Sequence, residues 1–266
     1  MTYIKRQRRD KRNLSVRDEV LGKEFDTNNC GKCVVINYVN KNNVTVEFYE
    51  PRCVINCRLA ELRKGRVKNP KYPLVYGIAC VGQGRYSAKT DYKVYKIWSD
   101  MICRCYNKKK AKDHPTYKDV EVCKEWLDFQ NFAKWCYNQK GFTSTDNSGK
   151  VFAIDKDILG NGKIYSPETC CFVPREINNL LLRRQNHRGE QALGVHKVCN
   201  SLKYTSAVSV GDRGNYLGSF DTEFEAFQAY KKAKESYIKE VADKWKGEIE
   251  DKVYQSLINY EVTFYQ

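Results

Sequence analysis

The chain has 266 residues, of which 41% are hydrophobic and 13% aromatic, so it can build two or three small cores and is not disordered throughout. Lys and Arg outnumber Asp and Glu by 47 to 32, and the net charge of +15 predicts a polyanionic partner: DNA, RNA or an anionic surface. No apolar run is long enough for a membrane span or a signal-peptide core, so we expect a cytoplasmic protein without a membrane partner.

The first twenty residues are expected to form a basic arm. Its cations are concentrated before Asn13, at Lys5, Arg6, Arg8, Arg9, Lys11 and Arg12. Such an arm can bind phosphates as a flexible tail, or it can be a disordered terminus that aids solubility. The sequence leaves both interpretations open.

Residues 21–88 carry the pattern of short strands. The runs 33–39 and 44–49 are rich in β-branched and aromatic residues, and Asn42-Asn43 between them is typical of a hairpin turn. A further apolar run, 75–81, follows a break at Gly65. Short strands joined by tight turns predict a small β-barrel, whose role is docking onto another protein or scaffolding.

The twelve cysteines raise the question of zinc. Without an export signal, free thiols are favoured over disulfides. Two cysteine pairs have spacings that zinc sites use, Cys30 with Cys33 and Cys53 with Cys57. A second candidate set consists of Cys105, His114, Cys123 and Cys170 or Cys171. For both sets the apolar neighbours favour reduced core cysteines, and Zn²⁺ remains the lesser alternative.

From residue 92 onwards the apolar period is that of helices. Tyr95, Trp98 and Ile102 recur at three- and four-residue steps, and a second aromatic series includes Trp126 and Phe129. These series predict two helices with a shared aromatic core. Residues 151–184 then predict strand, turn, strand and helix, with strands at 151–154 and 171–173, a turn at 160–162 and a helix that begins near Pro174.

The last part of the chain predicts a sheet followed by a helix. Strands are expected at 194–195, 204–210 and 216–220, and Asp221 or Thr222 is expected to cap the helix. The buried face of this helix is predicted to comprise Ala226, Ala229, Tyr230, Ala233, Tyr237 and Val241. The chain as a whole is therefore expected to be a multi-domain α+β protein, with domains at 1–20, 21–88, 92–188 and 192–266.

Residues 92–188 resemble phage HNH-family endonucleases. The positions that match in order are Trp98-Ser-Asp-Met101, Arg104-Cys-Tyr-Asn107, Tyr117, Val122-Cys123, Trp126, Phe129, Ile154-Asp-Lys-Asp157, Gly162, Tyr165-Ser-Pro-Glu168, Cys170 and Asn178. The resemblance implies a ββα-metal domain that binds one Mg²⁺ or Mn²⁺ ion and cuts or nicks DNA.

The resemblance assigns four roles in that centre. Asp155 matches a metal ligand at the end of the first strand, and Asn178 or Asn179 matches the ligand on the helix. The position of the catalytic base, a His in the family, holds Lys156. The position of the Asn that supports this His holds Thr169. A Lys side chain is protonated near pH 7, so it serves poorly as a base there. With Thr169 in the position of the supporting Asn, two of the four roles are altered.

Retained cleavage and a lapsed centre both remain open. Asp157 is a candidate substitute, as the base or as a second metal ligand. His114 and His187 lie outside the motif, and either could fold back onto the site. The alternative is a domain that kept the fold and lost the chemistry.

Residues 192–245 resemble the DNA-binding domain of plant Apetala and ethylene-response factors, which also occurs in phage HNH proteins. The likeness rests on Gly194-Val195, Tyr204, Ala207, Leu217-Gly-Ser-Phe220 and Ala226 to Tyr230. It implies a three-stranded sheet in the major groove of DNA, with a helix behind it. The DNA-facing candidates by matching position are His196, Lys197, Lys203, Thr205, Ser209, Arg213 and Tyr216.

The connector between the two regions is also basic. Arg183, Arg184 and Arg188 could follow a phosphate backbone or enter a minor groove, and the segment could equally be an exposed helix end.

The resemblances together predict a DNA-binding protein of phage type that acts in an infected bacterial host. The first hypothesis is an HNH-class endonuclease or nickase, with double-stranded DNA as its partner. The second is a regulatory or architectural DNA-binding protein with a lapsed nuclease centre. A more distant hypothesis is an RNA-binding factor, or one that binds a host or phage protein through the N-terminal barrel.

Overall fold

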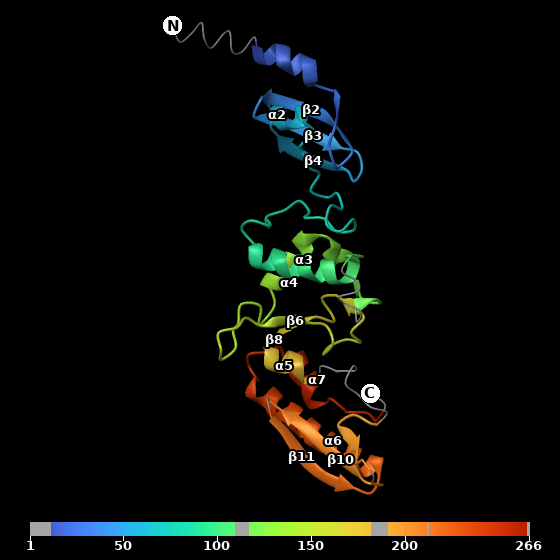
Figure 1. The fold of residues 1–266 in the computed structure, drawn as a ribbon. Coiled ribbons are helices and arrows are strands. Elements are labelled where there is room, and N and C mark those ends of the chain that lie inside the picture. The colour runs from blue at the N-terminus through green and yellow to red at the C-terminus, as the bar shows by residue number, and fades with distance from the viewer. Residues whose placement is uncertain (1–11, 110–116, 182–190, 200, 212, 265–266) are drawn as a thin grey trace. The chain divides into compact units, whose positions relative to one another are not determined.

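The computed structural model describes residues 12–109, 117–181, 191–199, 201–211 and 213–264 (Figure 1). The chain divides into two units, one formed by residues 1–118 and 122–134 and the other by residues 119–121 and 135–266. Strands and helices are mixed in both units, so the α+β class predicted from the sequence is confirmed. No helix in the described ranges is both long enough and apolar enough to cross a membrane.

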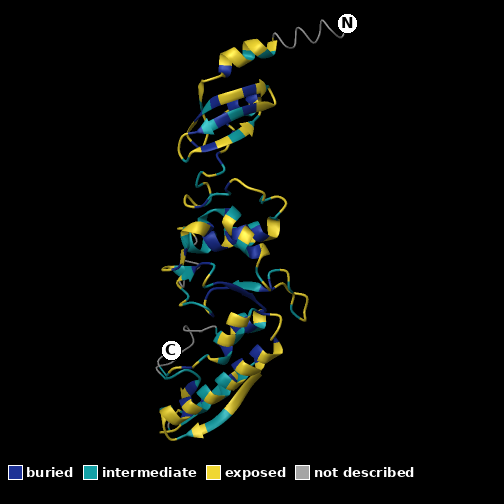
Figure 2. Ribbon diagram, turned by 180° about the vertical axis from the view of Figure 1, so that it is seen from behind, coloured by how far each residue is buried: buried dark blue, intermediate teal, exposed yellow. Residues whose placement is uncertain are grey.

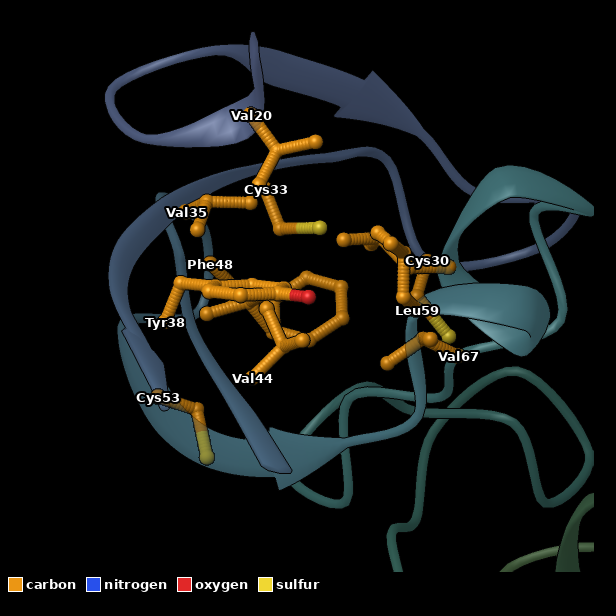
Figure 3. Packing of buried hydrophobic residues seen from close by; sticks show 12 residues of the cluster. Val20, Cys30, Cys33, Val35, Tyr38, Val44, Phe48, Cys53, Leu59 and Val67 are labelled. Carbon is orange, nitrogen blue, oxygen red and sulfur yellow. The ribbon is translucent and has the colours of Figure 1, made fainter. Parts of the chain in front are cut away.

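The first unit begins with an antiparallel sheet. Its strands β1 (Glu24–Asp26), β2 (Lys32–Asn40), β3 (Asn43–Phe48) and β4 (Cys53–Cys57) follow one another in chain order across the sheet. The alternation in β3 directs Val44, Val46 and Phe48 into the core and leaves the intervening side chains outside. Val20 from the helical residues 12–20 and Leu59 from the short helix α2 (Leu59–Arg63) complete this core (Figure 3).

The predicted barrel is wrong in two respects. In the part of the chain that the structure describes, β1 pairs only with β2 and β4 only with β3, so the sheet is open. The run 75–81 forms two isolated bridges, Val75 with Ala79 and Cys80 with Asp128, in place of a strand. Tyr76 and Gly77 both have positive φ angles and turn the chain back on itself. Among the residues that the structure describes, no fifth strand pairs with this sheet to close it.

The predicted aromatic core is confirmed. Helix α3 (Tyr92–Tyr106), the short strand β5 (Glu121–Val122), the 3₁₀ helix η2 (Lys124–Leu127) and helix α4 (Phe129–Tyr137) supply it. Trp98 is fully buried, and its indole N–H donates to the Trp126 carbonyl at 2.6 Å. Its ring lies 5.4 Å from that of Phe129, so burial and ring contacts together account for the helical spacing of these residues.

The second unit contains the predicted strand–strand–helix element. Strand β6 (Ala153–Asp155) pairs antiparallel with β8 (Cys171–Val173), and α5 (Arg175–Leu180) follows directly. The short strand β7 (Ile164–Tyr165) lies in the loop between β6 and β8. Phe172 packs between Trp135 and Phe142 on one side of the strand pair, with ring centroids 5.5 and 5.3 Å away.

The C-terminal sheet and helix also match their prediction. Strands β9 (Val195–Lys197), β10 (Tyr204–Val210) and β11 (Arg213–Phe220) form an antiparallel sheet in the order β11-β10-β9. The long helix α6 (Glu223–Lys244) packs on one face of it (Figure 1). Thr222 is the residue that caps α6, through a capping box with Glu225.

The last helix, α7 (Asp251–Ile258), returns to the strand–strand–helix element. The Ser256 hydroxyl donates to the Ile158 carbonyl at 2.8 Å. At the end of α6, the Trp245 indole N–H donates to the Glu176 carboxylate at 2.8 Å, and the Trp245 ring lies 5.7 Å from that of Phe152. The element around β6, β8 and α5 and the C-terminal helices therefore share one packed unit.

Candidate nucleic-acid interface and candidate metal centre

The three-stranded sheet has one covered and one open face. Val195, Ser206 and Val208 are buried, and the two valines belong to the core that α6 completes. Alternate residues point to the opposite side, which is exposed along much of β11 (Figure 2). The open face is therefore the one available to a partner.

The strand register sorts the seven DNA-facing candidates. Thr205 pairs with His196, so these two side chains share the open face. Ala207 and Ser209 lie two and four residues after Thr205 in β10, so they share its face. Tyr216 pairs with Ala207 and therefore lies on that face as well. Lys203 directly precedes β10, two residues before Thr205, so the alternation of β10 continued by one residue assigns it to the same face.

The strand register places two of the seven candidates, Lys197 and Arg213, away from the open face. Lys197 pairs with Tyr204, and Arg213 pairs with Val210. Tyr204 and Val210 pack in the core beneath α6, so the register places Lys197 and Arg213 at the margins of the covered face, where both are exposed.

Lys203 and Tyr216 are the most conspicuous side chains of the open-face set. Tyr216 is 66% exposed, which is unusual for a large aromatic residue on a sheet. The Lys203 ammonium lies 3.4 Å from the Asp221 carboxylate, with both side chains more than half exposed. Such an exposed pair is weak and can exchange its carboxylate for a phosphate.

The basic connector lies outside the described residues, and so do Arg183, Arg184 and Arg188. The same holds for most of the N-terminal arm, for His114 and for His187. Of the arm's cations only Arg12 and Arg17 are described, both in the helical residues 12–20.

In the candidate metal centre, Asp155 stands at the end of β6, as the resemblance implies. Its Oδ1 atom accepts hydrogen bonds from the main-chain N–H groups of Asp157 and Ile158, at 2.8 and 2.9 Å. The residue is 6% exposed, and this burial raises the pKa of the carboxyl, against the opposing effect of the two hydrogen bonds. Asp155 thus fastens the start of the loop that follows β6.

Lys156 occupies the position of the catalytic base, but its ammonium group donates a hydrogen bond to the neighbouring Asp157. Its Nζ atom donates to Asp157 Oδ1 at 2.9 Å and lies 5.8 Å from the centroid of the Tyr165 ring. Lys156 is 8% exposed, whereas the Asp157 side chain is about half exposed. An ammonium engaged in this way does not accept a proton from water.

Thr169 makes its hydrogen bonds within the loop between β6 and β8. Its hydroxyl donates to the Ile164 carbonyl at 2.8 Å and accepts from the Ser166 N–H at 3.1 Å. A Cβ atom at Gly160 would lie 2.9 Å from the Thr169 methyl group, so the loop is closely packed at this point. Tyr165 and Ser166, which the resemblance gives only as motif positions, complete the surroundings of Lys156 and Thr169.

The helix position of the centre is held by polar residues on α5. Asn178 is partly buried and Asn179 exposed, while Ile177 and Leu180 make the packing contacts of this helix. Among the described residues, no three His, Cys, Asp or Glu side chains come together as metal ligands.

The residues present do not fit a working ββα-metal centre. One Asp155 oxygen is committed to two main-chain groups, and the carboxylate is nearly buried. Lys156 brings a cation in place of a neutral base, and the Thr169 hydroxyl is engaged within its own loop. The element order is that of the family, but these three side chains make structural bonds.

The first cysteine set belongs to the core of the N-terminal sheet. Cys30, Cys33 and Cys53 are buried, and their sulfur atoms point to different parts of that core (Figure 3). Burial, with the nearby Cys57, raises the pKa of Cys33 to about 11, which disfavours the thiolate that zinc binding requires. Of the second set, His114 lies outside the described residues.

Comparisons of the chain with protein-family models, with curated proteins and with solved structures found no match. The two resemblances therefore depend on the motif residues themselves and on the order of the elements that carry them.

Proposed function

We propose that the chain is a DNA-binding protein that reads duplex DNA with the open face of its three-stranded sheet. The observation that carries this proposal is the register, which gathers His196, Thr205 and Tyr216 on one exposed face backed by α6. A twisted sheet of this width fits a major groove about 12 Å wide, and its alternate side chains reach base edges.

In this proposal the second unit combines a ββα element of HNH type with an Apetala-type sheet and helix. The ββα element acts as a scaffold, because its altered positions make structural bonds. The protein is then a regulatory or architectural factor of phage type, at work in the cytoplasm of the infected bacterium. Its duplex-binding sheet argues against the more distant hypothesis of an RNA-binding or protein-binding factor.

The proposal predicts that specificity depends on the open face. Lys203→Ala and His196→Ala are expected to relax the sequence preference of the full chain, at about 1–3 kcal/mol of discrimination for each good base contact. Arg213→Ala removes the same charge as Lys203→Ala but lies at the margin of the covered face, so it should leave the preference unchanged. Selection of bound duplexes from a random pool, followed by titration, measures both effects.

The comparison of Lys203→Ala with Arg213→Ala can contradict the proposed base-reading face. Equal losses of preference in Lys203→Ala and Arg213→Ala would show that the register does not determine which residues read bases. A wild-type chain that shows no affinity for any duplex would remove the proposed function itself.

The second candidate function is that of a metal-dependent HNH endonuclease. The observation that favours it is the order β6, β8, α5 with Asp155 at the end of β6. When bound in such a centre, Mg²⁺ or Mn²⁺ supplies phosphate binding and activation of water. Because Lys156 and Thr169 are held within the loop, we place this function second.

A plasmid assay separates the two functions. The wild-type chain with Mg²⁺ or Mn²⁺ is expected to bind supercoiled plasmid and leave it intact, as Asp155→Ala should. Nicking by the wild type that is lost in Asp155→Ala would establish the endonuclease. Nicking that appears only in Lys156→His with Thr169→Asn would show that the metal site survives and that only the base is missing.

A further inference from the structure

The positive charge of the chain is not where the proposed base-reading face is. Residues 189–266 contain 10 Lys and Arg against 12 Asp and Glu, whereas residues 1–188 contain 37 against 20. Phosphate contacts supply much of the affinity of DNA-binding proteins, and base contacts supply specificity. A sheet region with no net positive charge therefore needs phosphate contacts from elsewhere in the chain.

A short segment that follows helix α2 in the first unit has the required character. From residue 64 to residue 69 the side chains alternate between exposed and buried, and each exposed one is a cation: Lys64, Arg66 and Lys68. We call these three residues the basic strip. The buried positions that alternate with them are Gly65, Val67 and Asn69, so the uncharged side of the segment faces the protein.

The buried positions hold the basic strip in place. Val67 is part of the sheet core, beside Cys30 and Leu59 (Figure 3). Asn69 is fully buried, and its amide donates to the Pro51 carbonyl at 2.7 Å. The Gly65 carbonyl accepts from the Asn28 N–H at 2.8 Å.

Backbone geometry adds to this fixation. The Arg66 N–H donates to the Glu61 carbonyl at 2.9 Å. Gly65 has a φ of +65°, and a Cβ there would lie 2.6 Å from the Asn28 side chain, so the position requires glycine. The three cations therefore project from a backbone that is already ordered, which lowers the entropy cost of binding.

The cations of the basic strip are not neutralised. Within the described ranges, none of the three lies within 4.0 Å of a carboxylate, and the same is true of their neighbours Arg58 and Lys71. Arg63, in the same stretch, does pair with Glu19 at 2.7 Å.

We propose that the basic strip binds the sugar–phosphate backbone of duplex DNA. The three exposed cations fall within five residues of the chain, which gives a dense positive charge for the successive phosphates of one DNA strand. An anionic membrane surface is a poorer match, because the apolar residues of this segment are buried and none is left to insert into lipid. The inference rests on the proposed function. It assigns the affinity for DNA to the first unit and the sequence specificity to the second.

The test compares two triple variants of the full chain that remove the same charge. One is Lys64→Gln, Arg66→Gln and Lys68→Gln, and the other is Lys232→Gln, Lys239→Gln and Lys246→Gln, from exposed positions on or just beyond α6. Fluorescence anisotropy with a labelled duplex gives the dissociation constant across a salt series. The slope of log affinity against log salt is expected to fall by about 2.7 in the strip variant, since each lost contact removes about 0.9. The control variant should keep the wild-type slope.

Thermal melting followed by circular dichroism shows whether the strip variant is folded. If it is not, Arg66→Gln alone replaces it, with an expected fall in slope of about 0.9. A wild-type slope in the folded strip variant would overturn the role of the basic strip while leaving DNA binding in place. Failure of the wild type to bind duplex at any salt would instead remove the proposed function. Loss of binding to anionic vesicles or to RNA, with duplex binding unchanged, would also overturn the proposal.

Discussion

Replacing Gly194 with Ala is expected to lower the free energy of unfolding of the second unit by about 2–5 kcal/mol. Gly194 has a φ of +73°, and a Cβ there would overlap the ring of Tyr230, which is 8% exposed in the core between sheet and α6. The left-handed backbone contributes about 1–2 kcal/mol and the overpacking about 1–3 kcal/mol. Chemical denaturation of the full chain, with the Tyr and Trp fluorescence as the signal, measures the loss.

The chain offers a matched control for this substitution at Gly211. Its φ is +59°, but no atom lies within 4 Å of the Cβ that Ala would add. Gly211→Ala should therefore cost only the backbone part, about 1–2 kcal/mol. The Gly194 carbonyl also accepts from the Ala207 N–H at 3.1 Å, so amide exchange of β10 should rise in Gly194→Ala alone. Equal losses in both variants would show that the Tyr230 ring can move aside.

Asp155→Ala is expected to lower the free energy of unfolding by about 1–3 kcal/mol, whereas Asp155→Asn should cost little at neutral pH. Ala leaves the N–H groups of Asp157 and Ile158 without the acceptor that the carboxylate provides. The amide oxygen of Asn can still accept both hydrogen bonds, and the substitution removes a buried charge. Denaturant titrations of the two variants beside the wild type measure the difference.

The pH dependence of Asp155→Asn follows from the raised pKa of Asp155. The folded chain binds the Asp155 proton more tightly than the unfolded chain, so this group stabilises the fold at low pH. That contribution is lost as the pH rises through the folded-state pKa, so the stability of Asp155→Asn relative to wild type should increase from acid to neutral pH. If Asn were as destabilising as Ala at every pH, the carboxylate charge would itself be needed by the fold. Stabilisation of the wild type by Mg²⁺ that is absent in Asp155→Asn would identify a metal ligand.

Local patterns in the sequence were sufficient for several elements. The alternation of β3, the aromatic spacing in α3 and α4, and a helix cap at Asp221 or Thr222 were each predicted from neighbouring residues. These predictions succeeded because each pattern depends on the side of a strand or helix that is buried, and this side repeats with the period of the element. The strand predicted for 75–81 was wrong. The run is rich in β-branched residues, but the backbone turns at Tyr76 and Gly77, where φ is positive.

The candidate sites required the tertiary structure to a greater degree. Motif order alone located Asp155 and Lys156, but only the fold showed that one fastens a loop and that the other is buried against Asp157. Likewise, the resemblance assigned seven DNA-facing residues by matching position. The strand register, with its irregularity between Ser206 and Ala207, then placed Lys197 and Arg213 on a different face. A one-residue shift in register reverses the face of every side chain, so such assignments depend on pairing between strands.

Composition and residues close together in the chain were enough to predict the α+β class, the helix and strand periods, the start of α6 and a strongly basic balance. Three features became visible in the folded chain alone: the first sheet is open, Lys156 donates to Asp157, and Lys64, Arg66 and Lys68 project from one fixed segment. Burial of Val67 and Asn69 against residues distant in sequence sets that last feature, and long-range contacts of this kind leave no period in the sequence by which they could be predicted.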